Sequence, residues 1–280
     1  MLKTSTTDLI QQKLAWLHFN RELEVRSTAD LLEHAPGRNL LEIGGGDGFV
    51  AKQLSALGYH VTSIDLAPRF PKLYPVQKGD ATRLDFPDRT FDVVYSCHVL
   101  EEIHSIPNVF SEMKRVLKPN GVAVHIVATS WWAILTNLWH FLMLPAVILN
   151  FVLGRKRKTF SQADLAIPED NAVAREALAE KTANTVVGKM KRRLRWLFLH
   201  PVGAYPTFVH EIVFFSRASW KKVLQANGFV VAEMKHGPIV QSGARVYPFK
   251  AVRMRRVLAR CFAGSLSLLT LPCPPKTTRN

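Results

Sequence analysis

Cysteine is scarce in this 280-residue sequence. The three cysteines, Cys97, Cys261 and Cys273, are too few and too scattered for a metal site or a disulfide framework. The first residues, MLKTSTTDLIQQ, lack the apolar core of a signal peptide, so we expect a protein that is made and kept in the cytosol. Because 48% of the residues are hydrophobic, the chain has enough apolar side chains to fold around a core.

Acidic residues are rare in the second half of the chain. Residues 1–130 hold 14 Lys and Arg against 15 Asp and Glu, whereas residues 131–280 hold 23 against 7. The whole positive excess therefore lies in the second half, where it bears on the choice of partner rather than on the fold.

The stretch LLEIGGGDGFVAKQL (40–54) introduces the first structural signal. An apolar run at 39–43 precedes the glycines, residues 49–57 have helical spacing, and Gly58 is placed to end that helix. The next residues, YHVTSID (59–65), alternate as a strand and finish on Asp65. This order predicts a strand–turn–helix–strand unit, whose close backbone and helix N-terminus suit a nucleotide-like ligand.

The spacing of the glycines distinguishes between ligands. Glycines at 44, 46 and 48 follow Glu42 in the pattern E-x-G-x-G-x-G. The nicotinamide fingerprint would need a glycine at 49, where Phe49 stands. Asp65 lies 21 residues beyond Gly44, a spacing that suits a carboxylate accepting hydrogen bonds from a ribose diol.

Three later segments extend this pattern. Gly79-Asp80-Ala81 ends a short strand on an acid, FDVVYS (91–96) is typical of a buried strand, and 108–127 predicts an amphipathic helix, a Pro-Asn-Gly turn and a strand. With these motifs in order, residues 38–130 resemble the class I S-adenosylmethionine (SAM)-dependent methyltransferases, in particular the type 11 group that includes quinone-biosynthesis enzymes. The resemblance implies a Rossmann-like α/β fold with a seven-stranded sheet, SAM as cofactor and S-adenosylhomocysteine as product.

The resemblance also implies a set of cofactor contacts, at Glu42, Gly44, Gly46, Gly48, Asp65, Leu66, Asp80, Ala81, Ser96 and Cys97. The glycines would let the backbone approach the methionine moiety, with Glu42 near its ammonium group. Asp65 would hold the ribose hydroxyls and Asp80 the adenine amino group, with Ala81 beside the ring. Ser96 and Cys97 would line the sulfonium side. The alternative roles are a helix cap for Asp65 and a turn cap for Asp80.

The acceptor atom is predicted from a missing motif. Methyltransferases that act on planar amino nitrogens of nucleic acids usually carry [Asp/Asn/Ser]-Pro-Pro-aromatic after the fourth strand, and the corresponding residues 96–99, SCHV, include no proline. We therefore expect oxygen or carbon as the acceptor atom, with a simple amine as the alternative. The predicted bases are His98 and His210, and further candidates are Glu102, His104 and Glu211. For Glu101 and Glu102, a favourable charge at a helix N-terminus is the alternative role.

The stretch WWAILTNLWHFLMLPAVILNFVLG (131–154) has no charged residue and is followed by RKRK. Its length could span a bilayer. However, residues 210–237 are predicted to form a strand, a helix and a strand that complete the sheet, and one crossing would separate these strands from their partners. We therefore expect a re-entrant or surface-lying helical hairpin broken at Pro145, or else a soluble lid over the active site.

The predicted organisation has four parts: a SAM-binding core (1–130), an apolar and basic insertion before the last strands (131–204), the last strands (205–240) and a basic and apolar C-terminal tail (241–280). Basic segments at 189–201 and 249–272 accompany apolar runs, which favours an anionic membrane surface over nucleic acid as the partner. We predict methyl transfer to a lipophilic or membrane-associated small molecule, by a peripheral or monotopic protein at the inner face of a membrane. The alternatives are an RNA or protein methyltransferase and a non-catalytic SAM-binding protein.

Overall fold

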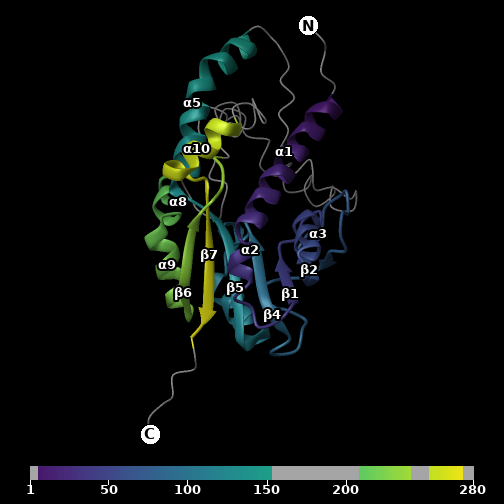
Figure 1. The fold of residues 1–280 in the computed structure, drawn as a ribbon. Coiled ribbons are helices and arrows are strands. Elements are labelled where there is room, and N and C mark those ends of the chain that lie inside the picture. The colour runs from purple at the N-terminus through teal and green to yellow at the C-terminus, as the bar shows by residue number, and fades with distance from the viewer. Residues whose placement is uncertain (1–5, 153–207, 241–251, 274–280) are drawn as a thin grey trace, which may run out of the picture.

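The computed structural model describes residues 6–152, 208–240 and 252–273. In these residues one sheet lies between two layers of helices (Figure 1). Buried side chains form an apolar cluster on each face of the sheet. This three-layer arrangement is the Rossmann-like α/β architecture that the sequence predicts.

The first strands confirm the predicted strand–turn–helix–strand unit. Strand β1 (Asn39–Ile43) pairs in parallel with β2 (His60–Asp65), and helix α3 (Phe49–Ala56) connects them. The short strand β3 (Gln77–Lys78) lies on the far side of β2, and β4 (Phe91–Cys97) lies on the far side of β1. All residues of β4 are buried, and a strand covered on both faces needs little polar alternation.

From β4 the chain continues through the 3-10 helix η1 (Leu100–Glu102) and helix α4 (Ile106–Val116) to β5 (Leu117–Ala128). The pairing of β4 with β5 jumps from Phe91–Leu117 to Val93–Val122, so residues 118–121 bulge out of the ladder. These residues contain the predicted Pro-Asn-Gly turn. Beyond the bulge, β5 is buried as far as its last residue.

Two helices precede the sheet. Helix α1 (Thr6–Ser27) descends from the N-terminus to the single turn α2 (Ala29–Leu32), which lies against the sheet (Figure 1). Val25 and Leu31 join the apolar cluster on the α3 face. The hydroxyl groups of Thr28 and Tyr95 share a buried hydrogen bond of 3.1 Å, which fastens the junction of the two helices to β4.

The C-terminal part of the core departs from the predicted strand, helix and strand. It consists of helix α8 (Phe208–Phe214), helix α9 (Arg217–Ala226) and strand β6 (Phe229–His236). The helix at α9 and the strand at β6 agree with the prediction, but the strand expected after His210 is wrong.

The burial of residues in and after α8 shows why this stretch is helical. Glu211 and Phe215 are buried, whereas Val209 and Val213 are 54% and 64% exposed. The buried positions are therefore four residues apart, as on one face of a helix. A short apolar run such as EIVFFS fits either a strand or a helix, so the sequence alone does not decide between them.

The seventh strand comes from the end of the chain. Helix α10 (Val252–Phe262) leads into β7 (Ser265–Pro272), which runs antiparallel between β5 and β6. The strand order β3-β2-β1-β4-β5-β7-β6 confirms the predicted seven-stranded sheet. The prediction that residues 241–280 form a tail outside the sheet is wrong for β7, because its first six residues are all buried.

The long apolar segment also differs from the prediction. It forms one helix, α5 (Ser130–Val152), which continues through Pro145 instead of breaking there into a hairpin. Proline removes the single hydrogen bond of its own nitrogen, and here the helical backbone persists on both sides of it. The first turn of α5 packs on α8, where the Ser130 hydroxyl donates to the Ile212 carbonyl at 2.6 Å.

Further along α5, three described apolar side chains face outward. Leu138, Phe141 and Leu142 are between 50% and 58% exposed. Within the described ranges, no helix has the length and apolar character needed to cross a membrane. The basic stretches 155–158 and 189–201 lie outside the described residues, so the predicted boundaries of the insertion stay predictions.

Candidate active site

The first part of the site is the glycine-rich turn between β1 and α3. The N–H groups of Gly44 and Gly45 both donate to the carbonyl of Ile64, at 2.8 and 2.9 Å. The N–H of Gly46 donates to Oδ2 of Asp65 at 2.8 Å, while Oδ1 of Asp65 accepts from the N–H of Ala67, also at 2.8 Å. Asp65 therefore joins this turn to the end of β2.

Gly48 packs against a second loop. Its φ is +82°, a conformation that favours glycine, and a Cβ placed on it would lie 2.6 Å from the carbonyl oxygen of Tyr74. The close approach of two backbone segments at this position therefore requires glycine. The N–H of Leu73 donates to the carbonyl of Asp47 at 2.8 Å, which adds a second bond between the same two segments.

Arg69 lies over the turn. Its N–H donates to the carbonyl of Gly46 at 2.9 Å, and its guanidinium group contacts the position that a Gly46 side chain would occupy. The turn therefore carries a cation beside Gly46. The sequence analysis missed this residue, because an arginine four positions after Asp65 belongs to none of the motifs considered.

Glu42 lies beneath the same turn and is only 1% exposed. The Ser63 hydroxyl donates to its Oε2 at 2.5 Å. Burial, with the nearby negative charges of Asp65 and Asp47, raises the pKa of Glu42 to about 7, although the Ser63 bond opposes the shift. A cation placed beside this carboxyl group would favour its ionised form.

Helix α1 covers the turn from the other side. Nε2 of His18 lies 2.7 Å from Oδ2 of Asp47. The His18 ring also stacks on the Phe49 ring, with 4.1 Å between the centroids and 2° between the planes. Both partners flank the N-terminus of α3, so α1 shields the turn from solvent.

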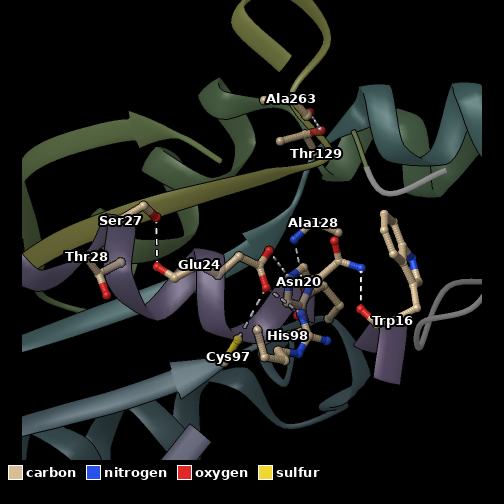
Figure 2. Close-up of polar contacts among 12 residues, drawn as sticks. Trp16, Asn20, Glu24, Ser27, Thr28, Cys97, His98, Ala128, Thr129 and Ala263 are labelled. Atoms are coloured by element: carbon tan, nitrogen blue, oxygen red, sulfur yellow. Dashed lines mark hydrogen bonds and ion pairs between the residues drawn. The ribbon is translucent and has the colours of Figure 1, made fainter. Parts of the chain in front are cut away.

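A polar cluster forms where α1 meets the end of β4 (Figure 2). Glu24, on α1, has no exposed surface, and its two oxygens have different partners. Oε1 accepts from Nε2 of His98 at 2.9 Å, and Oε2 accepts from Nη1 of Arg21 at 2.6 Å. The Cys97 thiol lies 3.9 Å from Oε2.

The cluster extends from β4 to the end of β5. Nδ1 of His98 lies 3.5 Å from Oε1 of Glu101. The same oxygen accepts a hydrogen bond from the backbone N–H of Ala128, the last residue of β5. Both ring nitrogens of His98 therefore face carboxyl oxygens.

These contacts set the charge states of the cluster. Burial alone would lower the pKa of His98, but the carboxyl groups of Glu24 and Glu101 outweigh burial and raise the pKa. Burial acts against ionisation of Glu24, yet His98 and Arg21 hold the pKa of this carboxyl group well below its usual range. These contacts favour the protonated form of the His98 ring, whereas a general base acts in its neutral form. Burial raises the pKa of the Cys97 thiol well above its usual value, so Cys97 stays protonated.

The cluster also has the spacing of a metal site. One ligand atom each from Glu24, Cys97 and His98 lies within 4.8 Å of the other two. However, the Arg21 guanidinium already occupies one side of Glu24, and a second cation there would meet its charge.

The remaining predicted residues lie in several environments. Asp80 is exposed, and its Oδ1 accepts from both the N–H and the hydroxyl of Thr82, as in the predicted turn cap. Ala81 is partly buried behind it, and Leu66 is 67% exposed. The Ser96 hydroxyl is fully buried and bonds Nδ1 of His125 at 2.8 Å.

The candidate bases are spread over the molecule. His98 lies in the polar cluster, whereas His210 is exposed on α8 and Glu211 is buried there. His104 lines an open hollow of about 320 Å³ that is otherwise mainly apolar and is bordered by Pro107 and Phe214, away from the glycine-rich turn.

The family of the chain follows from a comparison with known proteins. Residues 16–234, which include the turn, the polar cluster, strands β1 to β5 and most of β6, match the family model described as methyltransferase domain. The chain belongs to this methyltransferase family. The match confirms the predicted class I SAM-dependent methyltransferase, and SAM is its cofactor.

Curated relatives of this methyltransferase match it over part of their length. It is 34% identical over 125 residues to demethylmenaquinone methyltransferase of Beutenbergia cavernae, covering 41% of this chain and 52% of that protein. It is 33% identical over 102 residues to a sterol 24-C-methyltransferase of Gibberella zeae, covering 31% of this chain and 27% of that protein. The methyltransferase chain thus spans about half or less of the length of these relatives.

One solved structure is the 1,6-didemethyltoxoflavin-N1-methyltransferase of Burkholderia thailandensis, with bound 1,6-didemethyltoxoflavin and S-adenosylhomocysteine. Its TM-score against this methyltransferase is 0.46, at 13% sequence identity, over 90% of this chain and 79% of that chain.

Proposed function

We propose that this methyltransferase transfers the methyl group of SAM to oxygen or carbon of a lipophilic or membrane-associated small molecule. Bound SAM supplies a methyl group on a sulfonium, which is a good leaving group. The chain must therefore mainly align the acceptor and exclude water.

The glycine-rich turn supports the proposed cofactor contacts. Glu42 is a buried carboxyl group that lacks a cationic partner among the contacts described, which fits the ammonium group of the methionine moiety. The Arg69 guanidinium over Gly46 fits its carboxylate, a role that the sequence analysis did not assign. Asp65, at the end of β2, retains lone pairs for ribose hydroxyls beside its two backbone bonds.

Helix α1 excludes water in this proposal. The helix is held over the turn by the contact of His18 with Asp47 and by the stacking of His18 on Phe49. It is held over the end of β4 by the pair of Glu24 and His98. Removing water from the site strengthens each electrostatic contact within it.

The lipophilic acceptor is inferred from apolar side chains that lie exposed on α5, α8 and α10. We call this set the apolar surface: Trp131, Leu138, Phe141, Leu142, Val209, Val213, Met254, Val257 and Leu258. The three helices lie at one end of the sheet in Figure 1. Ring contact between Trp131 and Phe262, with 4.7 Å between the centroids, joins α5 to α10. Contiguous exposed apolar side chains often mark a membrane or ligand site.

Positive charge accompanies the apolar surface. Arg253, Arg256 and Arg260 are exposed on α10, the helix that carries Met254 and Val257. Each such cation near an anionic membrane contributes about 1 kcal/mol to binding. Because α5 starts two residues after β5 ends, the apolar surface begins close to the polar cluster. A lipophilic acceptor could therefore pass from the membrane to the site.

Transfer of labelled methyl into a cell extract tests this function. The purified protein is given methyl-labelled SAM and a whole-cell extract, which is then separated into lipid, aqueous-metabolite, protein and nucleic-acid fractions. We expect label in the lipid fraction, and at subsaturating SAM about tenfold less label with the Asp65→Ala variant. Label in RNA or protein would contradict the lipophilic acceptor while leaving the cofactor intact. Tight SAM binding with no label in any fraction would favour the non-catalytic alternative.

A further inference from the structure

Two buried oxygen atoms in and beside the polar cluster lack a hydrogen-bond donor among the described residues. They are Oδ1 of Asn20 and Oε2 of Glu101, on side chains that are 4% and 6% exposed. The other end of each side chain is already engaged. Nδ2 of Asn20 donates to the Trp16 carbonyl at 2.9 Å, and Oε1 of Glu101 accepts from the N–H of Ala128. Neither side chain can turn to find a partner without losing a bond.

Unpartnered buried acceptors need an explanation, because each forfeits its hydrogen bond to water. Asn20 lies one helical turn before Glu24, so both side chains are on the buried face of α1. Glu101 follows His98 on η1 and contacts its ring. In Figure 2 the Asn20 side chain lies beside the Ala128 backbone, near the His98–Glu24 pair. Both free oxygens therefore belong to the place where α1 meets the ends of β4 and β5.

The charges of the cluster indicate what kind of group would fit. Two acidic side chains, Glu24 and Glu101, stand beside two basic ones, Arg21 and His98. An anionic or cationic ligand would upset this balance, whereas a neutral group would not. Both free atoms are acceptors, so the ligand must supply two donors. A pair of hydroxyl groups is the neutral group that also offers oxygen as a methyl acceptor.

We propose that Asn20 and Glu101 bind two hydroxyl groups of a neutral, lipophilic methyl acceptor beneath helix α1. This inference rests on the proposed function and narrows its substrate class to dihydroxylated lipophiles, with oxygen as the methylated atom. Methyl transfer from bound SAM would release the proton of that hydroxyl group, and the Glu101 carboxylate that accepts its hydrogen bond would take this proton. Both oxygens are closed to solvent in the structure, so the acceptor enters only when α1 moves. The two His–carboxylate contacts of α1, at Asp47 and at Glu24, are the contacts that entry must loosen.

Matched ligands test the proposal by binding rather than by turnover. The probes are 4-hexylresorcinol and 4-hexylcatechol, each compared with its dimethyl ether, which has the same tail and no hydroxyl proton. Affinity is measured calorimetrically on the full chain saturated with S-adenosylhomocysteine. We expect at least one diol to bind about tenfold or more tightly than its ether. Equal affinities of diol and ether, for both pairs, would overturn the proposal.

Two variants test whether Asn20 and Glu101 cause the preference for the diol over its ether. Asn20→Leu removes one free acceptor, and Glu101→Gln replaces the free oxygen with an amide donor while keeping an oxygen for Ala128. Each should reduce the preference for the diol to less than about threefold. The controls Gln12→Leu and Glu33→Gln make the same changes at exposed positions and should leave the preference intact. A preference that survives both site variants would overturn the proposal.

Binding of S-adenosylhomocysteine separates this inference from the proposed function. If all the variants bind S-adenosylhomocysteine but the wild type does not distinguish diol from ether, only the hydroxyl site is refuted. If the wild type does not bind S-adenosylhomocysteine, the proposed function itself fails. Thermal unfolding checks that each variant is folded, and should Glu101→Gln unfold, Asn20→Leu and the wild-type ligand pairs still decide the question.

Discussion

The backbone N–H of Gly46 donates a hydrogen bond of 2.8 Å to the carboxylate of Asp65, which joins the glycine-rich turn after β1 to the end of β2. One carboxylate thus positions the turn and is also the proposed ligand of the ribose.

Replacing Asp65 with alanine should weaken SAM binding by about tenfold or more, because it removes a charged acceptor and frees the N–H groups of Gly46 and Ala67. Calorimetry with SAM measures the loss. Asp85→Ala, at an exposed position after β3, serves as the control and should bind SAM like the wild type. If Asp65→Ala binds SAM normally, Asp65 is not the ligand of the ribose.

Gly48→Ala should destabilise the fold more than Gly58→Ala. Both glycines have positive φ, +82° and +88°, so both substitutions strain the backbone by about 1–2 kcal/mol. At Gly58 nothing lies within 4 Å of the added methyl group, whereas at Gly48 the methyl would meet the Tyr74 backbone at 2.6 Å. Urea unfolding gives the loss of unfolding free energy for each variant, and the difference between the two losses is the cost of the clash with Tyr74. Equal losses would mean that the Tyr74 contact is unimportant.

SAM affinity should rise with pH between about 6 and 8. The pKa of Glu42 is raised to about 7, so its carboxyl group is partly protonated at neutral pH, whereas pairing with the ammonium group of SAM requires the ionised form. Binding then releases a proton, which calorimetry in buffers of different ionisation enthalpy detects. In Glu42→Gln this pH dependence should vanish. An affinity that stays constant from pH 6 to 8 in the wild type would place the ammonium group elsewhere.

The Glu24–His98 pair should contribute most to stability between about pH 4.5 and 6.5. The pKa of His98 is raised from its usual 6.5, so its contribution is complete below 6.5 and is lost as the pH rises through the folded value. The pKa of Glu24 is lowered from 4.5, so its contribution is complete above 4.5 and is lost as the pH falls. Glu24→Gln should therefore cost about 3 kcal/mol of unfolding free energy at pH 5.5 and less at pH 9.

The control for this prediction is Glu22→Gln on the same helix. Glu22 pairs with Arg26 at 2.6 Å, but the Arg26 side chain is 71% exposed, so the substitution should cost less than about 0.5 kcal/mol. Urea unfolding at both pH values gives the comparison. A Glu24→Gln loss as small as that of Glu22→Gln would show that the buried pair does not stabilise α1 on the core.

Val257→Asp should weaken membrane binding. This residue is 60% exposed on α10 among arginines, so an acidic side chain there removes apolar contact and opposes their charge. Flotation with phosphatidylglycerol vesicles, against phosphatidylcholine vesicles, should show at least about a fivefold loss of binding to the anionic lipid. Val230→Asp, on β6 at a 50% exposed position, is the matched control. Equal behaviour of the two variants would argue against the apolar surface as the membrane contact.

The first half of the fold was predictable because each element carries a local signal. Gly58 follows the end of α3, Asp65 ends β2, and the Pro-Asn-Gly turn separates α4 from the buried part of β5. These signals depend on backbone conformation and on neighbours in the sequence, so they can be recognised without the tertiary structure.

The C-terminal elements were not predictable in the same way. The run at α8 is too short to distinguish a helix from a strand, and β7 follows a basic amphipathic helix that resembles a membrane segment. The place of β7 depends on pairing with β5, more than 130 residues earlier, as in the partners Val124 and Leu269. No local pattern encodes such a pairing.

The candidate site was predictable where it lies on the turn and not where it lies on α1. Asn20 and Glu24 are polar residues on a buried face, so α1 lacks the apolar stripe by which a packed helix is recognised. His98, the partner of Glu24, and Glu101, which contacts His98, were noticed because they follow β4. The sequence suggested a base at His98, and the structure adds that contact with Glu24 raises the pKa of its ring.

Because β7 lies inside the sheet but comes last in the sequence, the order of synthesis affects folding. A ribosome finishes β6 36 residues before it finishes β7, yet within the described residues β6 has only β7 as its neighbour in the sheet. Until the last segment emerges, the nascent chain presents the open edge of β5 and an unpaired β6, both of which can pair with other chains. A premature stop codon before residue 265 would therefore leave a gap inside the sheet rather than a shorter tail. Its product should aggregate or be degraded.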